Sequence, residues 1–128
     1  MAKTIIEPEE LARPIGPFSS AVTKGNFVFV SGTVGRDKEG KIVGEGDVRV
    51  QTGKTLENIK VLLEKAGATM DDVVKVTVFL KDVKDYQGMN EVRAEFFPKD
   101  PPASSAVAIK DFMLPGLLVE IEAIAIKD

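Results

Sequence analysis

The sequence predicts an α+β fold, a two-layer sandwich in which two helices cover one face of a mixed sheet of five or six strands. Three observations lead to this prediction. Apolar residues dominate or alternate in several short segments, they recur at three- and four-residue spacing in two longer segments, and the segments follow the order β-β-β-α-β-α-β-β. With 128 residues the chain has the length of one domain, so we expect a single domain over residues 1–128.

The first three strands are predicted close to the N-terminus. A short strand is expected at 4–6, and β-rich runs at 21–23 and 27–31 flank the tripeptide 24–26, which contains a glycine. A tight loop of this kind between two β-rich runs is typical of a hairpin. The glycine-rich stretch that follows, 32–46, is expected to be a loop with a short β segment at its residues 41–43.

The first helix is the clearest element of the sequence. Asp47 is a favourable N-cap residue, and Gly67 stands where a glycine commonly ends a helix. Between them, residues that can face a core recur at helical spacing: Val48, Thr52, Leu56, Ile59, Leu62, Leu63 and Ala66. The pattern predicts a helix from Asp47 to about residue 66.

Another strand, a helix and a further strand are predicted next, at 73–80, 85–97 and 103–109. Pro98 is expected to stop the helix, because proline lacks the backbone donor that a helix interior needs. The period of two puts one set of residues of the strand 73–80 on one face: Val74, Val76, Val78 and Leu80. The helix carries an apolar stripe: Tyr86, Met89, Val92 or Arg93, and Phe96.

The last predicted strand, 117–126, is apolar on both faces but carries two carboxylates, Glu120 and Glu122. The period of two places both on the same side of the sheet. A carboxylate among aliphatic side chains costs free energy unless it is paired, hydrogen-bonded or hydrated. One of the two is explained as an ordinary surface residue, and the other is the best single candidate for a functional site.

Two helices cover only one face of such a sheet. Residues 27–30 and 117–126 are nevertheless apolar on both sides. A large uncovered apolar face is rare on a monomer, so we infer that the second face is buried against other copies of the chain, as in a closed ring.

Composition excludes several kinds of chemistry. The chain has no cysteine and no histidine, which excludes disulfides, a cysteine nucleophile, a histidine base and Cys/His metal sites. The net charge of −3, with basic residues spread along the chain, argues against a nucleic-acid partner. No signal peptide and no apolar run of about 20 residues is present, so no membrane partner and a cytoplasmic location are expected.

Read together, several segments resemble the Rid family, the reactive-intermediate deaminases, also called YjgF-like proteins. The resemblance runs in unbroken order over nearly the whole chain, and the combination of segments is more specific than any one of them. The matching stretches are IGPFSSAV at 15–22, FVFVSG at 27–32, QT at 51–52, LENIK at 56–60, DDVVKVTVFL at 71–80, NEV at 90–92, PPA at 101–103 and VEIEAIA at 119–125.

This resemblance implies a chorismate-mutase-like fold, a homotrimer and small-molecule clefts at the subunit interfaces. Active members hydrolyse enamines and imines such as 2-aminoacrylate to 2-keto acids and ammonia, without a metal or cofactor. Glu120 matches the glutamate thought to orient or activate the attacking water. The other residues that the resemblance places at or near the ligand are Phe18, Ser31, Gly32, Tyr86, Asn90, Ser104 and Ala106. A core or interface stripe explains Tyr86 and Asn90 equally well.

Two positions depart from the pattern of active members. Phe18 stands where many carry tyrosine, and Ser104 stands where deaminating members carry an arginine that holds the substrate carboxylate. A hydroxyl cannot replace the bidentate guanidinium, so ordinary 2-aminoacrylate hydrolysis is not expected. Arg36, in the loop after Ser31 and Gly32, is either a solvated loop residue or a cation that reaches into the cleft from another direction. Two functions remain open: an imine or enamine deaminase with a different substrate, and a trimer that binds or senses a small metabolite without catalysis.

Overall fold

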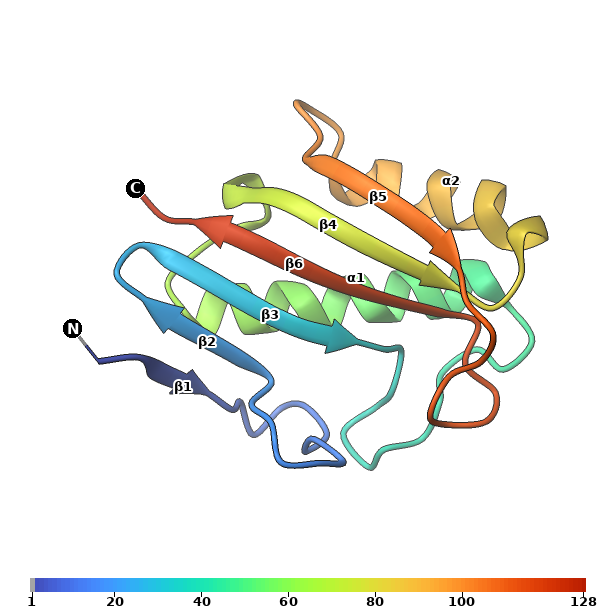
Figure 1. Cartoon of the computed structure of the whole chain (residues 1–128), viewed down its shortest axis with the longest axis horizontal. Coiled ribbons are helices and arrows are strands. Elements are labelled where there is room, and N and C mark those ends of the chain that lie inside the picture. Colours follow the sequence, from blue (N-terminus) through green and yellow to red (C-terminus); the bar gives the residue numbers. More distant parts are fainter. Residues whose placement is uncertain (1) are drawn as a thin grey trace.

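The computed structural model describes residues 2–128 and has one sheet with two long helices (Figure 1). The strands are β1 Thr4–Ile6, β2 Ala21–Lys24, β3 Phe27–Thr33, β4 Val73–Leu80, β5 Ala103–Ala108 and β6 Val119–Ile126. The helices are α1 Val48–Lys65 and α2 Tyr86–Phe96, and short 3-10 helices, η1 Met70–Asp72 and η2 Val83–Asp85, precede β4 and α2.

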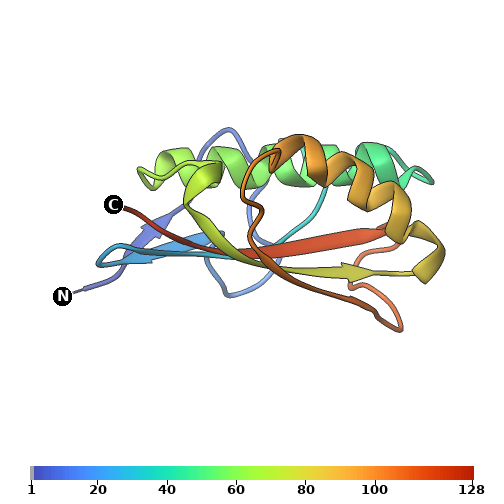
Figure 2. The same cartoon turned by 90° about the horizontal axis from the view of Figure 1, so that it is seen from above.

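The six strands lie in the order β1-β2-β3-β6-β4-β5. Neighbouring strands are antiparallel except β4 and β5, which pair in parallel, so the sheet is mixed. Figure 2 shows both α-helices on the same side of the sheet. The predicted α+β sandwich and its element order are therefore confirmed.

The caps of α1 are those that the sequence indicates. The Asp47 carboxylate accepts hydrogen bonds from the backbone N–H groups of Arg49 and Val50, which would otherwise lack partners at the helix start. At the other end Ala66 is the C-cap, and Gly67 follows with φ of +82°, a conformation that glycine adopts without steric cost.

The prediction that Val74, Val76, Val78 and Leu80 share one face of β4 is wrong for Val74, and the other three residues are buried. Val74 is 45% exposed, and Val73 is buried in its place. The pairing of β4 with β6 shifts register between Val73 and Lys75, which indicates a β-bulge there. A bulge puts two successive residues opposite one, so the strict alternation fails at this point.

Two further expectations need correction. The β segment expected at 41–43 is reduced to one isolated bridge between Arg36 and Ile42. On α2, Met89 is fully buried, whereas Tyr86 of the same predicted stripe is 44% exposed, so the stripe does not pack against the core along its whole length.

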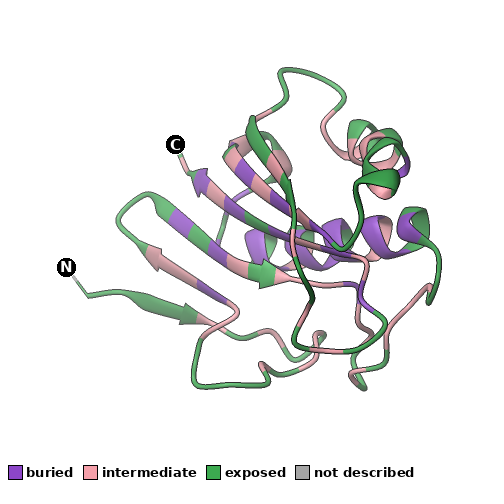
Figure 3. Ribbon diagram, turned by 45° about the vertical axis from the view of Figure 1, so that its right-hand side comes forward, coloured by how far each residue is buried: buried purple, intermediate pink, exposed green. Residues whose placement is uncertain are grey.

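The sheet face away from the helices is bare and largely apolar. Phe27 and Phe29 are each 45% exposed, and their rings stack with centroids 5.8 Å apart. They lie opposite Ile126 and Ile124 of the central strand β6. Figure 3 shows exposed and buried residues alternating along β3 and β6, as expected where only one face of a sheet is covered. We call this surface, made by Phe27, Phe29, Ile124 and Ile126, the bare face.

Gln51 of α1 joins the loop that precedes α1 to the loop that precedes β6. Its side chain is fully buried. Its Nε2 donates to the carbonyls of Gly44 and Gly116, at 3.1 and 2.9 Å, and its Oε1 accepts from the backbone N–H of Leu118 at 2.8 Å. One amide side chain therefore fixes the entry to α1 and the entry to β6.

Replacing Gln51 by alanine should lower the free energy of unfolding by about 2–3 kcal/mol, because three backbone groups lose their partner at a buried site. Urea unfolding at one protein concentration measures this. The matched control is Gln87→Ala on the exposed side of α2, for which a change below about 0.5 kcal/mol is expected. Equal losses in the two variants would contradict the role assigned to Gln51.

Candidate functional site

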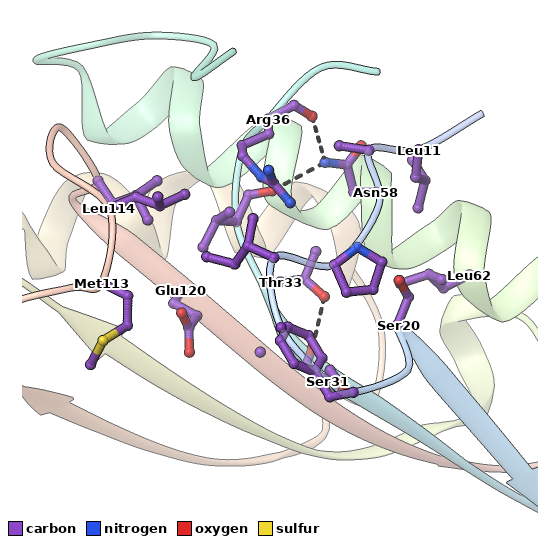
Figure 4. A pocket seen from close by; sticks show the side chains of 18 of the residues that line it. Leu11, Ser20, Ser31, Thr33, Arg36, Asn58, Leu62, Met113, Leu114 and Glu120 are labelled. Atoms are coloured by element: carbon purple, nitrogen blue, oxygen red, sulfur yellow. Dashed lines mark hydrogen bonds between the residues drawn. The ribbon is translucent and has the colours of Figure 1, made fainter. Parts of the chain in front are cut away.

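A cavity of about 650 Å³ lies where the N-terminal loop, the end of β3 and the loop before β6 meet (Figure 4). Its lining is mostly apolar, with a few polar side chains, as in typical small-molecule sites. The polar residues that line it are Ser20, Ser31, Thr33, Arg36, Asn58 and Glu120. The apolar residues around it include Leu11, Ile15, Phe18, Leu62, Met113, Leu114 and Leu117.

Glu120 reaches this cavity from β6. It lies opposite Phe79 of β4, on the face of the sheet away from the helices, and is half-buried. Burial raises the pKa of the Glu120 carboxyl above its ordinary value of 4.5, and the negative charge of Glu122 adds to the rise. Glu122 lies on the same face, as its spacing predicts, and is exposed. The half-buried glutamate is thus the one in the cavity.

Gly32 makes room for the Glu120 carboxylate. A Cβ at position 32 would lie 2.8 Å from Glu120 Cδ, and closer still to one of its oxygens. The pairing of β3 with β6 shifts register between Val30 and Thr33, which brings residues 31 and 32 out of the regular ladder beside Glu120.

Hydrogen bonds connect the end of β3 to the N-terminal loop. Ser31 donates through Oγ to the carbonyl of Ser19 at 2.6 Å and through its backbone N–H to the carbonyl of Ser20 at 3.0 Å. Phe18, two residues before Ser20, is 51% exposed and forms part of the apolar wall. With no hydroxyl on this ring, the wall offers no proton at this point.

Asn58 and Arg36 shape the opposite side of the cavity. Asn58 Nδ2 donates to the carbonyls of Val34 and Arg36, at 3.1 and 3.0 Å, and so holds the loop after β3 against α1. The half-buried Arg36 side chain lines the cavity and donates from Nη2 to the carbonyl of Arg13 at 3.2 Å. Figure 4 shows the Asn58 bonds and the position of Glu120 across the cavity.

The remaining predicted ligand-binding residues lie elsewhere on the single chain. Asn90 and Ser104 line a second pocket of about 400 Å³ between α2 and β5, together with Arg93. Ser104 and Ala106 pair with Val76 and Val78 of β4, so they lie on the helix side of the sheet, opposite the face of Glu120. Tyr86 is exposed at the start of α2. The chain therefore carries two separate groups of predicted residues, one on each face.

The sequence analysis did not predict three residues whose side chains hold the walls of the two pockets in place: Gln51, Asn58 and Arg93. The first two had a signal in the sequence. Gln51, Asn58 and Leu62 share one helical face at spacings of seven and four, so two amides stand on a stripe that faces the core. Buried amides need partners, and irregular backbone is where unpaired carbonyls are found. Arg93 had no such signal, because its partner Ser104 belongs to another element.

Among residues 2–128 there is no cluster of three or more side chains that could hold a metal ion. Within the same residues no helix is long and apolar enough to cross a membrane.

The pH dependence of stability should report the environment of Glu120. A raised native pKa means that the native state binds more protons than the unfolded state between the ordinary and the raised value, so stability falls as pH rises through that window. Glu120→Gln removes this ionisation. The variant should therefore be more stable than the unmodified protein at about pH 7, and the difference should vanish towards about pH 4.

Urea unfolding at a series of pH values, at fixed protein concentration, measures the difference. Glu122→Gln is the matched control, since it removes the same charge two residues away at an exposed position and should change stability less. A Glu120→Gln variant that is less stable than the unmodified protein at neutral pH would contradict the desolvation of this carboxyl.

Comparison with known proteins places this arrangement in a family. The model of the family described as Endoribonuclease L-PSP matches residues 9–127. A RutC family protein of Pyrococcus abyssi is 48% identical, over 100% of both chains. The structure of RidA from Psychrobacter is 36% identical with a TM-score of 0.89, covering 96% of this chain and 98% of the other.

A third similar structure was determined with a ligand. TdcF from E. coli, solved with bound serine, is 34% identical with a TM-score of 0.90, covering 98% of this chain and 99% of the other. The match extends over nearly the whole chain at identities well above those that show a fold alone. The chain belongs to the L-PSP endoribonuclease family, which includes the Rid and YjgF-like proteins that its segments resemble.

Proposed function

We propose that this protein is a homotrimer with small-molecule clefts at its subunit interfaces, and that it hydrolyses a reactive imine or enamine to a carbonyl product and ammonia. The observation that carries the proposal is the half-buried Glu120, whose pKa is raised and which faces a mostly apolar cavity large enough for a metabolite. No metal or cofactor takes part in the proposed reaction.

The proposed reaction needs only positioned water and a proton carrier. Water adds its oxygen to the carbon of the C=N bond while one of its protons passes to the Glu120 carboxylate. The same proton then goes to the nitrogen of the tetrahedral intermediate. The hydroxyl proton passes through the Glu120 carboxylate to this nitrogen as the C–N bond breaks, so that the hydroxyl oxygen becomes the carbonyl and ammonia leaves. An enamine first takes a proton on carbon to become the imine. A carboxyl with a raised pKa suits such a role, since it exchanges protons closer to neutral pH.

The relatives support a small, nitrogen-containing ligand. TdcF of E. coli was solved with bound serine, an amino acid that carries both an amine and a carboxylate. The apolar wall and the few polar groups of the cavity here suit a molecule of that size.

The trimer is proposed on the basis of the exposed apolar surface. The bare face carries two stacked phenylalanines, and the rim of the cavity adds Ile15 and Met113, 58% and 91% exposed. Surfaces of this kind mark interaction sites on soluble proteins. As part of this proposal, the α2–β5 pocket of one copy lies beside the Glu120 cavity of the next, so that each cleft takes residues from two copies.

A second candidate function is binding or sensing without catalysis. Two departures favour it: Ser104 in place of the arginine of deaminating members, which would put the chain in an arginine-lacking subgroup, and Phe18 in place of tyrosine. Both remove polar groups that would touch a substrate.

Direct assay separates the two functions. Purified protein is mixed with freshly generated imines, with and without a carboxylate, and ammonia and carbonyl product are followed. Release of both products above the uncatalysed rate supports the enzyme. Saturable binding without any turnover supports the sensor and removes the catalytic proposal.

The family description also names ribonuclease activity, which we do not propose for this chain. Its net charge is −3, and its 17 basic residues are spread along the sequence. An RNA titration at low and high salt tests this directly, because phosphate contacts give a steep salt dependence.

A further inference from the structure

Arg93 is held in a fixed position between α2 and the edge strand β5. Its Nε donates to Asn90 Oδ1 at 2.9 Å, and its Nη1 donates to Ser104 Oγ at 2.8 Å. The first bond lies within α2, and the second crosses to β5. A guanidinium tied at two points loses most of its freedom before any ligand arrives, which lowers the entropic cost of binding.

Those two bonds leave most of the guanidinium donors free. An arginine side chain has five N–H groups and no acceptor, so three N–H groups remain, one on Nη1 and two on Nη2. Nη1 and Nη2 form one of the two guanidinium edges that can receive a carboxylate through two parallel hydrogen bonds, and the other edge contains Nε, which is hydrogen-bonded to Asn90.

No carboxylate of the described chain neutralises this charge. The ion pairs found within residues 2–128 are Arg49 with Glu91, Lys65 with Glu10, and Lys81 with Asp111. The positions three and four residues from Arg93 on its helix side hold Met89, Asn90, Phe96 and Phe97, none of which is acidic. The positive charge is therefore available to a ligand.

The surroundings strengthen an anion contact. Arg93 is half-buried in the pocket of about 400 Å³, whose other walls are mostly apolar and include Val76, Phe97 and Pro102. A charged hydrogen bond is stronger where water is partly excluded than on an open surface.

We propose that Arg93 binds the carboxylate of the ligand and so supplies, from α2, the cation that the family resemblance leads one to expect at position 104. Ser104 is then a positioning residue, because its hydroxyl accepts a hydrogen bond from Arg93 and holds the guanidinium in place. This inference rests on the proposed function for its cleft, and it makes a small carboxylate the class of ligand. The lack of an arginine at position 104 thus does not exclude carboxylated imines as substrates.

Binding of an unreactive probe tests Arg93 apart from catalysis. Pyruvate and its neutral amide, pyruvamide, are titrated into the unmodified protein, and dissociation constants are read from NMR chemical shifts. Arg93→Gln should weaken pyruvate binding by about 10- to 150-fold, the loss expected for charge-assisted hydrogen bonds, and leave pyruvamide binding unchanged.

Two variants control for charge and for the competing cation. Arg49→Gln removes the same charge from a residue that pairs with Glu91, and it should bind pyruvate normally. Arg36→Gln tests the competing cation, which lines the Glu120 cavity, and it should weaken pyruvate binding less than Arg93→Gln does. A loss that follows Arg36→Gln rather than Arg93→Gln would overturn the proposal.

Rescue gives a test that a merely structural arginine would not pass. In the Arg93→Gln background, Ser104→Arg should restore much of the affinity for pyruvate, because it places a guanidinium group at a position next to the original one. Arg93→Lys keeps the positive charge but lacks the planar guanidinium that binds a carboxylate through two hydrogen bonds. Its affinity for pyruvate should therefore lie between those of the unmodified protein and Arg93→Gln. Thermal unfolding and solution mass establish that each variant is folded and assembled.

The outcomes separate this inference from the proposed catalysis. Pyruvate binding that depends on Arg93, without turnover of any imine, supports the carboxylate-binding role of Arg93 and excludes the proposed catalytic activity. Turnover of carboxylated imines with the same KM in Arg93→Gln supports the enzyme and overturns the carboxylate site. Pyruvate bound no more tightly than pyruvamide by the unmodified protein would overturn it as well.

Discussion

Replacing Glu120 by glutamine should lower the rate of imine hydrolysis by about 100- to 10,000-fold, the usual contribution of a positioned proton carrier. The amide keeps the shape of the side chain in the cavity but cannot take a proton from the attacking water. Steady-state ammonia release measures the effect. Because the chemical step is affected rather than binding, kcat should fall and the dissociation constant for an unreactive carbonyl analogue should hold.

Glu122→Gln is the matched control for this experiment. It makes the same chemical change two residues away on the same face, at an exposed position, and should keep most of the activity. A further variant, Gly32→Ala, tests the position of the carboxylate. The new Cβ displaces the Glu120 carboxylate without removing it, so activity should fall although the chain stays folded. Full activity in Glu120→Gln would show that another group carries the proton in the reaction.

Replacing Phe29 by glutamate should break the assembly into single chains. Phe29 lies on the bare face, 45% exposed and stacked on Phe27. In the proposed trimer it is buried against other copies, where an unpaired charge is strongly unfavourable. Light scattering should give about three times 13.8 kDa for the unmodified protein and close to 13.8 kDa for the variant.

The control for Phe29→Glu is Val50→Glu. Val50 is also 45% exposed, but it lies on α1 in the helical layer. The same charge should leave the mass unchanged there, because the bare face is on the other side of the sheet. If the unmodified protein has the mass of one chain at micromolar concentration, the interface clefts do not form, and the catalytic proposal loses its site.

The sequence predicted the order of elements well because the strongest signals are local. Asp47 and Gly67 limit α1 by their own conformational preferences, and the hairpin loop at 24–26 separates two runs of β-forming residues. The error at Val74 has the opposite origin. A bulge depends on how two strands pair, and neither strand alone records where its register will shift against the other.

For the site, too, the sequence predicted what single segments specify but not the contacts between different elements. Phe18, Ser31, Gly32 and Glu120 were expected near one another, and the structure brings them around one cavity, although their binding of a ligand stays a prediction. The contact between Arg93 and Ser104 joins residues on different elements. Neither residue type is unusual at its position, so only the folded chain reveals the pairing.

The two amides of α1 have a consequence for how such a protein can change during evolution. Every partner of the Gln51 and Asn58 side-chain amides is a main-chain atom: the carbonyls of Val34, Arg36, Gly44 and Gly116, and the N–H of Leu118. The loops are thus held through main-chain groups, and these bonds do not depend on the side chains that the loops carry. The exceptions are proline at position 118, which would lack the N–H, and Gly44 and Gly116, whose φ is positive. New side chains can accumulate in the cavity walls while the anchoring persists, so one scaffold can acquire a repertoire of ligands by substitution in its loops.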